Sequence, residues 1–241
     1  MLVVASLISG RSPPAARTRR VSPLSVSIPL QRPRGLVLAD LLASHRSRAT
    51  RIAWDIVLVI GAAALVGALA QVSIKLSFTP VPITGQTLGV LLAGTSLGWR
   101  RGAAALAFYA VAGVAGVPWF SGHAHGYAGV TASFGYIIGF IFAAAICGYL
   151  AERGADRSVI GSVPAMIAGE IMIYLFGVTW LAVDLHVGVA KALSLGFTPF
   201  VIGDAIKAAM AAGLLPAAWK LAGRGRSGAP RPGESRPADV V

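Results

Sequence analysis

Charged side chains are scarce in this sequence, since Asp, Glu, Lys and Arg make up only 12% of its 241 residues. Soluble domains carry about 25% charged residues, so the deficit argues against a soluble enzyme or binding domain. Apolar residues account for 56% of the chain, and the mean hydropathy is +0.73. Because a helix needs about 20 residues to cross a bilayer, the apolar part can supply about six spans. We therefore predict an all-α membrane protein, a bundle of six transmembrane helices.

Cysteine and catalytic motifs are also nearly absent. The single cysteine, Cys147, excludes an internal disulfide, and we interpret it as a small buried residue of an apolar run. The sequence has no GxxxxGK[ST] phosphate-binding loop, no HExxH and no GxSxG motif. His123 and His125 lack a third ligand, so we interpret them as solvated side chains of a loop rather than metal ligands. We expect no enzymatic activity, no cofactor and no metal site.

Acidic residues are outnumbered by basic ones, 9 to 21, and the net charge is +12. A basic chain can bind nucleic acid, but no basic face with interleaved aromatic residues is visible, so we expect no nucleic-acid partner. Residues 1–45 are rich in Arg, Pro and Ser, and we predict a disordered basic extension there. Residues 223–241 are expected to be a disordered cytoplasmic tail, which leaves 46–222 as the six-helix membrane domain.

Six apolar segments follow one another between these ends. They cover approximately residues 54–72, 85–97, 102–116, 133–151, 159–182 and 195–221. Basic residues near their ends are distributed ten to two if both termini are cytoplasmic, and cytoplasmic loops carry the excess of Lys and Arg. The pattern predicts a multi-pass protein of the cytoplasmic membrane, surrounded by lipid, with the loops after the first, third and fifth segments outside.

Three charged residues, Glu170, Asp204 and Lys207, lie inside these apolar segments. Charges at such depth are rare and usually mark a substrate or ion path. Asp204 and Lys207 are three residues apart, which places them on one face of a helix. Asp204 would then lie on the order of 14 Å below the outer end of its segment and form the floor of an outward-facing pocket. The alternative is a structural ion pair that locks the fifth and sixth helices.

The first outer loop, "FTPVPITGQTLGV", is a candidate lid. Pro80 and Pro82 hold the chain extended and cannot continue a helix. Hydrogen-bonding side chains then follow at the start of the second segment: Thr84, Gln86 and Thr87. The alternative is an ordinary connector.

Two further patterns have both a functional and a structural reading. Tyr109, Tyr136 and Tyr174 lie on inner faces, where they would contact a ligand or simply pack. Ala64 and Ala68 form a small-xxx-small pair in the first segment, a spacing that allows another helix to approach closely.

These pieces in this order resemble the BioY family of biotin-specific components of energy-coupling factor (ECF) transporters. The resemblance is carried by "AQVSIKLSFTPVPITGQTLGVLLAG", "LGWRRGAAALAFYAVAGVAGVPWF", "SFGYIIGF", "GEIMIYLFGVTWLA" and "PFVIGDAIKAAMAA". It implies a six-helix protein that captures biotin from outside with high affinity, its loop between helices one and two closing over the site. It also implies partners, namely a transmembrane coupling subunit and two ATPase subunits, with Ala64 and Ala68 on the docking face.

The resemblance assigns site residues as well. Asp204 and Lys207 match the family's acid and base on the sixth helix, and residues 80–86 match its loop. Biotin offers ureido N–H donors, an apolar ring and a carboxylate, so Asp204 would accept from the ureido group. Tyr109 and either Trp119 or Phe120 would form walls. Lys207 would pair with Asp204, with the biotin carboxylate or with Glu170. The alternative function is a stand-alone proton-coupled vitamin carrier that uses Glu170 and Asp204 as proton sites.

Overall fold

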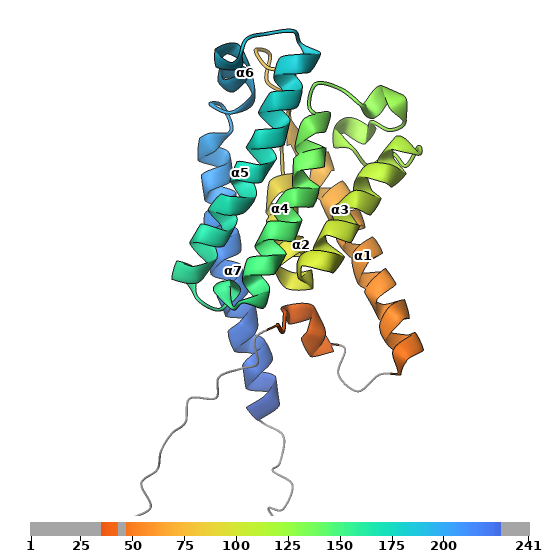
Figure 1. The fold of residues 1–241 in the computed structure, drawn as a ribbon, viewed down its shortest axis with the longest axis vertical. Helices are drawn as coiled ribbons and strands as arrows, with labels where there is room; N and C mark the ends of the chain where they lie inside the picture. Colours follow the sequence, from red (N-terminus) through yellow and green to blue (C-terminus); the bar gives the residue numbers. More distant parts are fainter. Residues whose placement is uncertain (1–34, 43–46, 228–241) are drawn as a thin grey trace, which may run out of the picture. The chain divides into compact units, whose positions relative to one another are not determined.

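The computed structural model describes residues 35–42 and 47–227. Within these ranges the chain forms seven α-helices (Figure 1): α1 (Arg48–Gln71), α2 (Gln86–Leu97), α3 (Trp99–Val114), α4 (Phe134–Glu152), α5 (Val159–Asp184), α6 (Val189–Gly196) and α7 (Val201–Ser227). The remaining elements are short: strands β1 (Ser73–Ile74) and β2 (Ile83–Thr84), and 3-10 helices η1 (Leu38–Leu42), η2 (Ser121–His123), η3 (Tyr127–Gly129) and η4 (Ala155–Arg157).

Four of the described helices, α1, α4, α5 and α7, are long and apolar enough to cross a membrane. Helices α2 and α3 have only 12 and 16 residues. Helix α2 packs against α1, α3, α4 and α7, and most of its side chains are buried. A short helix is tolerated at this depth because protein rather than lipid surrounds its ends. The prediction of an all-α membrane bundle built from six apolar segments is confirmed.

The sixth apolar segment, predicted over residues 195–221, differs from the prediction, because it starts with the last two residues of α6 and then continues, after a break, as α7. Helix α6 ends at Gly196, and the chain turns before α7 begins at Val201. Pro199 lies in this turn, and the residue before a proline disfavours the helical conformation. Asp204 therefore lies in the first turn of α7, and the expectation of a position on the order of 14 Å inside its helix was wrong.

Both predicted disordered ends also differ where the structure describes them. Residues 35–42 were placed in the disordered extension, yet they include η1, and Val37 and Ala39 are buried in the core of the bundle. Asp40 there forms an ion pair with Arg101 at 2.7 Å. Helix α7 continues to Ser227, past the predicted start of the tail at residue 223. The rest of both predicted ends lies outside the described residues.

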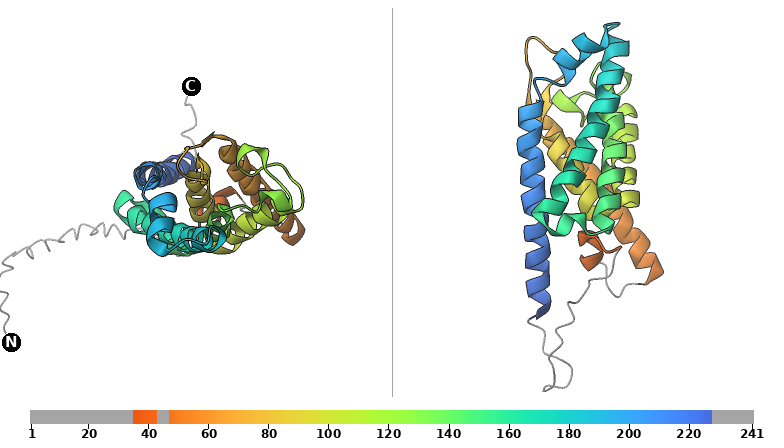
Figure 2. Two further views of the ribbon diagram at one scale, coloured as in Figure 1. Left: turned by 90° about the horizontal axis from the view of Figure 1, so that it is seen from above. Right: turned by 60° about the vertical axis from the view of Figure 1, so that its left-hand side comes forward.

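The loops that cover the site gather at one end of the bundle, at the top of Figure 1. The segment between α1 and α2 forms a small antiparallel hairpin, in which Ser73 pairs with Thr84 and Ile74 with Ile83. The loop with η2 and η3 and the short helix α6 lie at the same end, as the right-hand view of Figure 2 also shows. The start of α1 and the end of α7 lie at the opposite end.

Candidate functional site

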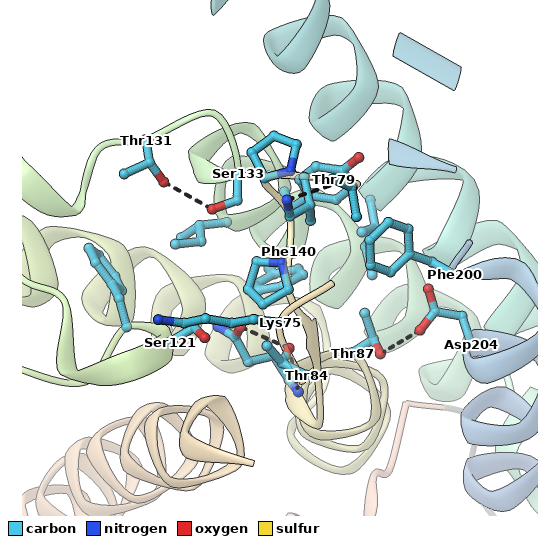
Figure 3. A pocket seen from close by; sticks show the side chains of 18 of the residues that line it. Lys75, Thr79, Thr84, Thr87, Ser121, Thr131, Ser133, Phe140, Phe200 and Asp204 are labelled. Atoms are coloured by element: carbon cyan, nitrogen blue, oxygen red, sulfur yellow. Dashed lines mark hydrogen bonds between the residues drawn. The ribbon is translucent and has the colours of Figure 1, made fainter. Parts of the chain in front are cut away.

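A cavity of about 420 Å³ lies under these loops and is the candidate site (Figure 3). Ligand pockets typically measure about 300–1,000 Å³, so it has room for a vitamin-sized molecule. Its walls come from the β1–β2 hairpin loop, the loop between α3 and α4, and helices α2, α4, α5 and α7. Its polar lining residues include Lys75, Thr79, Thr84, Gln86, Thr87, Ser121, Thr131, Ser133, Asp204 and Lys207.

Asp204 is the centre of a hydrogen-bond cluster at one side of this cavity. It is 6% exposed. Its Oδ1 accepts a hydrogen bond from Thr87 at 3.0 Å and pairs with the Lys207 Nζ at 2.8 Å, and its Oδ2 accepts one from the Tyr174 hydroxyl. Lys207 also donates to Thr87 at 3.0 Å. Because the N-terminus of a helix carries partial positive charge, the start of α7 also favours a carboxylate here.

A second polar cluster starts from Gln86, which is also buried and lines the cavity. Its Oε1 accepts a hydrogen bond from Thr84 at 3.0 Å, and its Nε2 donates to the Tyr109 hydroxyl at 2.8 Å. Tyr109 in turn donates to the backbone carbonyl of Trp119 at 3.1 Å, and the Trp119 indole donates to the carbonyl of Tyr109 at 2.9 Å. This chain fixes the orientation of the Gln86 amide toward the cavity.

Aromatic and apolar side chains form the remaining walls. Phe120 is 3% exposed and lines the cavity together with Phe140, Ile173 and Phe200. Tyr136 lines it too, and its hydroxyl donates to the carbonyl of Gly196 at 2.6 Å. This bond ties α4 to α6 at the end where the loops close.

The structure therefore separates the predicted site residues into two groups. Those that line the cavity are Thr84, Gln86, Phe120, Tyr136, Asp204 and Lys207. Tyr109, Trp119 and Glu170 are not among the lining residues: the first two lie behind Gln86. Both carboxylate oxygens of Glu170 are buried without a hydrogen-bond partner among the described residues.

Sequence reasoning missed the lining residue Lys75, which Figure 3 shows across the cavity from Asp204. Lys75 and Lys207 are the cations among the described lining residues. Lys75 is exposed, and Ser121, Thr131 and Ser133 are the neighbouring polar groups that Figure 3 draws on that side. Its position beside the PVPIT loop, where it is one of two lysines on the predicted outer side, was the available signal.

The remaining predicted features are the small residues of α1 and the absence of a metal site. Ala64 and Ala68 are exposed, whereas Ala63 and Gly67 on the neighbouring face are buried. Among the described residues there is no group of three or more His, Cys, Asp or Glu side chains that would hold a metal ion.

Comparison with known protein sequences gives the family that the motifs resemble, BioY. The model of the BioY family matches residues 42–224 of the chain. A biotin transporter BioY of Rhizobium etli is 41% identical over 169 residues, which cover 66% of this chain and 89% of the relative. A biotin transporter BioY of Thermotoga maritima is 39% identical over 152 residues, which cover 62% of this chain and 86% of the relative.

A solved structure shares the fold. It is a crystal structure at 2.1 Å of the S-component for biotin from an ECF-type ABC transporter. The two chains superimpose with a TM-score of 0.65 at 23% sequence identity, and the match covers 73% of this chain and 95% of the other. The similarity supports the all-α membrane fold.

Proposed function

The chain belongs to the BioY family, and from that premise we propose that it captures biotin in the cavity beside Asp204 as the S-component of an ECF-type transporter. The family is one of transporters rather than enzymes. The observation that carries the proposal is the cavity itself, which has a carboxylate with organised donors at one side. At the other side it has a cation, Lys75, that forms no ion pair with a described residue. Biotin has the complementary pattern, with ureido N–H donors at one end and a carboxylate at the other.

The ureido ring binds next to Asp204. An ionised carboxylate has about four acceptor positions, and three of them are taken by Thr87, Tyr174 and Lys207. One position remains for a ureido N–H. Lys207 is suited to a second contact, because its ammonium group can donate to the ureido carbonyl beside this N–H while it stays paired with Asp204. Lys207 is then a partner of both Asp204 and the ligand.

The biotin carboxylate points to Lys75 at the other side of the cavity. Lys207 is already engaged with Asp204, whereas Lys75 forms no ion pair with any described residue. The thioether ring and the valerate chain lie between the two lysines against Phe120, Phe140 and Phe200. The hairpin loop closes over the ligand, and Thr79 secures it by donating to the carbonyl of Leu195 at 2.7 Å.

Calorimetric titration of the purified protein with biotin tests the Asp204 assignment. Hydrogen bonds to charged groups are worth roughly 1.5–3 kcal/mol each, so D204A weakens binding by about a hundredfold or more. D204N keeps an acceptor oxygen and loses less. Lys207→Ala also weakens binding because it leaves a buried charge unpaired. A structural lock predicts a different result: an apolar double replacement of Asp204 and Lys207 that binds biotin with wild-type affinity would contradict the ligand contact.

Titration with biotin and with its neutral carboxamide tests the orientation. Because Lys75 is exposed, K75Q reduces the affinity for biotin by up to about fivefold and leaves the affinity for the amide unchanged. Lys191→Gln is the matched control, since Lys191 is an exposed lysine of α6 that does not line the cavity. Equal losses for biotin and the amide would overturn the assignment of the carboxylate to Lys75.

The transport context includes an energising module, for which we propose a transmembrane coupling subunit and two ATPase subunits, with Ala64 and Ala68 of α1 on the docking face. The competing function is proton-coupled carriage by this chain alone, through Glu170 and Asp204. Uptake of labelled biotin in cells with and without coupling ATPases separates the two functions. ATP-dependent uptake supports the S-component role, and undiminished uptake in the absence of any coupling ATPase contradicts it.

A further inference from the structure

A second hollow lies on the outer surface of the bundle, near the end opposite to the cavity. It is a shallow groove of about 280 Å³, lined by Trp99, Phe142, Ala145, Ile146, Tyr149 and Met172. These residues come from the start of α3, the second half of α4 and the middle of α5. All six side chains are apolar or aromatic, so the groove offers almost no polar surface to a small soluble ligand.

The groove follows one stripe of α4. Phe142, Ala145, Ile146 and Tyr149 have the spacing i, i+3, i+4 and i+7, which puts them on one helix face along about 10 Å of its axis. Gly148 allows the start of α3 to pack tightly beside this stripe, since an added Cβ there would lie 2.4 Å from the backbone nitrogen of Trp99. The groove is therefore an elongated apolar depression that runs along α4.

Two arginines flank this depression at its rim. The Arg153 guanidinium lies 3.3 Å from the ring centroid of Tyr149, and the Arg100 guanidinium lies 5.0 Å from that of Trp99. Both arginines are exposed, and neither forms an ion pair with a described residue. Arg101 differs, because it pairs with Asp40 and Asp55. The nearby carboxylate of Glu152 is engaged with the backbone nitrogen of Trp99 at 3.2 Å.

We propose that this groove binds an anionic phospholipid, with one acyl chain along the stripe of α4 and the phosphate between Arg100 and Arg153. Trp and Tyr side chains are enriched at the membrane–water interface, at the level of the lipid headgroups. Trp99 and Tyr149 therefore indicate that the two arginines beside them also lie at headgroup level. Basic pockets between helices bind anionic headgroups by the same charge complementarity. A free phosphate ion would use the arginines but leave the apolar stripe without a role.

Native mass spectrometry of the purified protein with equal amounts of phosphatidylglycerol and phosphatidylcholine tests the site. The wild-type protein retains phosphatidylglycerol in preference. Each arginine near an anionic lipid contributes about a factor of five, so R100Q/R153Q reduces the preference by tenfold or more. R48Q/R51Q is the matched control: it removes the same charge from exposed arginines at the start of α1, outside the groove, and leaves the preference unchanged.

A groove-filling variant tests the acyl chain separately. Ala145→Phe keeps both arginines and fills the depression, so it reduces the retention of both lipids by severalfold while the unfolding temperature stays within a few degrees of wild type. Equal effects of the two double-arginine variants would show that only surface charge attracts the lipid and would overturn the proposal. Full lipid retention by Ala145→Phe would also overturn it. None of these readouts requires biotin, so the outcome is independent of the proposed function.

Discussion

At the scale of single residues, two buried carboxylates of the bundle differ in how well they are satisfied. Asp204 accepts hydrogen bonds from Thr87, Tyr174 and Lys207. Glu170 has no hydrogen-bond partner among the described residues for either oxygen. A buried ion pair with further hydrogen bonds offsets much of its desolvation cost, whereas an isolated carboxylate does not. Removing the charge should therefore have opposite effects at the two positions.

We expect Glu170→Gln to raise the unfolding temperature and to change the biotin affinity by less than about twofold, because it removes a buried charge outside the cavity lining. Asp204→Asn is the matched comparison: the same chemical change there lowers both stability and affinity, because it breaks the pair with Lys207. Thermal unfolding and calorimetric titration measure the two effects. A tenfold loss of affinity in Glu170→Gln at unchanged stability would instead make Glu170 a ligand contact.

Asp156, between α4 and α5, gives a pH-dependent prediction. It is 1% exposed, and its Oδ2 accepts a hydrogen bond from the Trp219 indole at 2.6 Å. Burial raises the pKa of Asp156, and the Trp219 bond and the charge of Arg157 only partly oppose this. The folded state then holds the proton more tightly than the unfolded state. Stability is lost as the pH rises from the ordinary aspartate range, about 4, to the raised pKa, and is constant above it.

Asp156→Asn removes this dependence and keeps an acceptor for Trp219. We expect the variant to unfold at a higher temperature than the wild type. This difference should grow as the pH rises from about 4 to the raised pKa of Asp156 and stay constant above that pKa. Thermal unfolding in detergent from about pH 4 to about pH 8 measures it. A wild-type stability that instead increases with pH relative to the variant would contradict the raised pKa.

At the scale of elements, α1 has two faces of small residues with different surroundings. Gly67 is buried against Trp119, and a Cβ added there would lie 2.9 Å from the Trp119 Cβ. Ala64 and Ala68 are exposed. Small residues allow close helix packing on either face, but only the exposed one is available to a partner.

We expect Ala64→Trp to leave biotin binding unchanged and to reduce ATP-driven uptake and copurification with a coupling subunit by tenfold or more. Gly67→Leu is the control on the other face: it displaces Trp119 and should lower the unfolding temperature by itself, because overpacking typically costs about 1–3 kcal/mol. Loss of biotin binding in Ala64→Trp with an intact fold would show that this face does not serve docking alone.

At the scale of the whole molecule, the described bundle has a loop-covered end with the cavity and an opposite end where α1 starts and α7 ends (Figure 1). Arg48, Arg51, Arg100 and Arg153 lie at the starts of α1 and α3 or the end of α4, whereas Lys75 and Lys191 lie at the cavity end. Cytoplasmic ends carry the basic excess. We therefore propose that both termini are cytoplasmic and that the cavity opens outward.

Cysteine labelling in intact cells tests this orientation. His125→Cys should react with a membrane-impermeant thiol reagent, and Arg48→Cys should react only after the membrane is permeabilised. The native Cys147 is buried, so the background is low. Labelling of Arg48→Cys alone in intact cells would reverse the orientation and with it the outward-facing cavity.

The amino-acid sequence by itself determined the class of protein and the positions of helices α1 to α5. Hydropathy is a local property, so the five segments before residue 195 agree with α1 to α5 to within a few residues at most ends. The charges of Asp204 and Lys207 inside an apolar segment marked them as functional candidates. The resemblance to the BioY family then grouped them with Thr84 and Gln86, and all four line the cavity.

Tertiary structure decided what depends on neighbours. Whether an aromatic side chain forms a wall or a support depends on what packs in front of it, so Phe120 lines the cavity while Tyr109 and Trp119 hold Gln86 from behind. The break before α7 moved Asp204 to a helix start. The fold of the hairpin loop brought Lys75 to the cavity. Such relations join residues far apart in the chain, and a local pattern of hydropathy or spacing does not contain them.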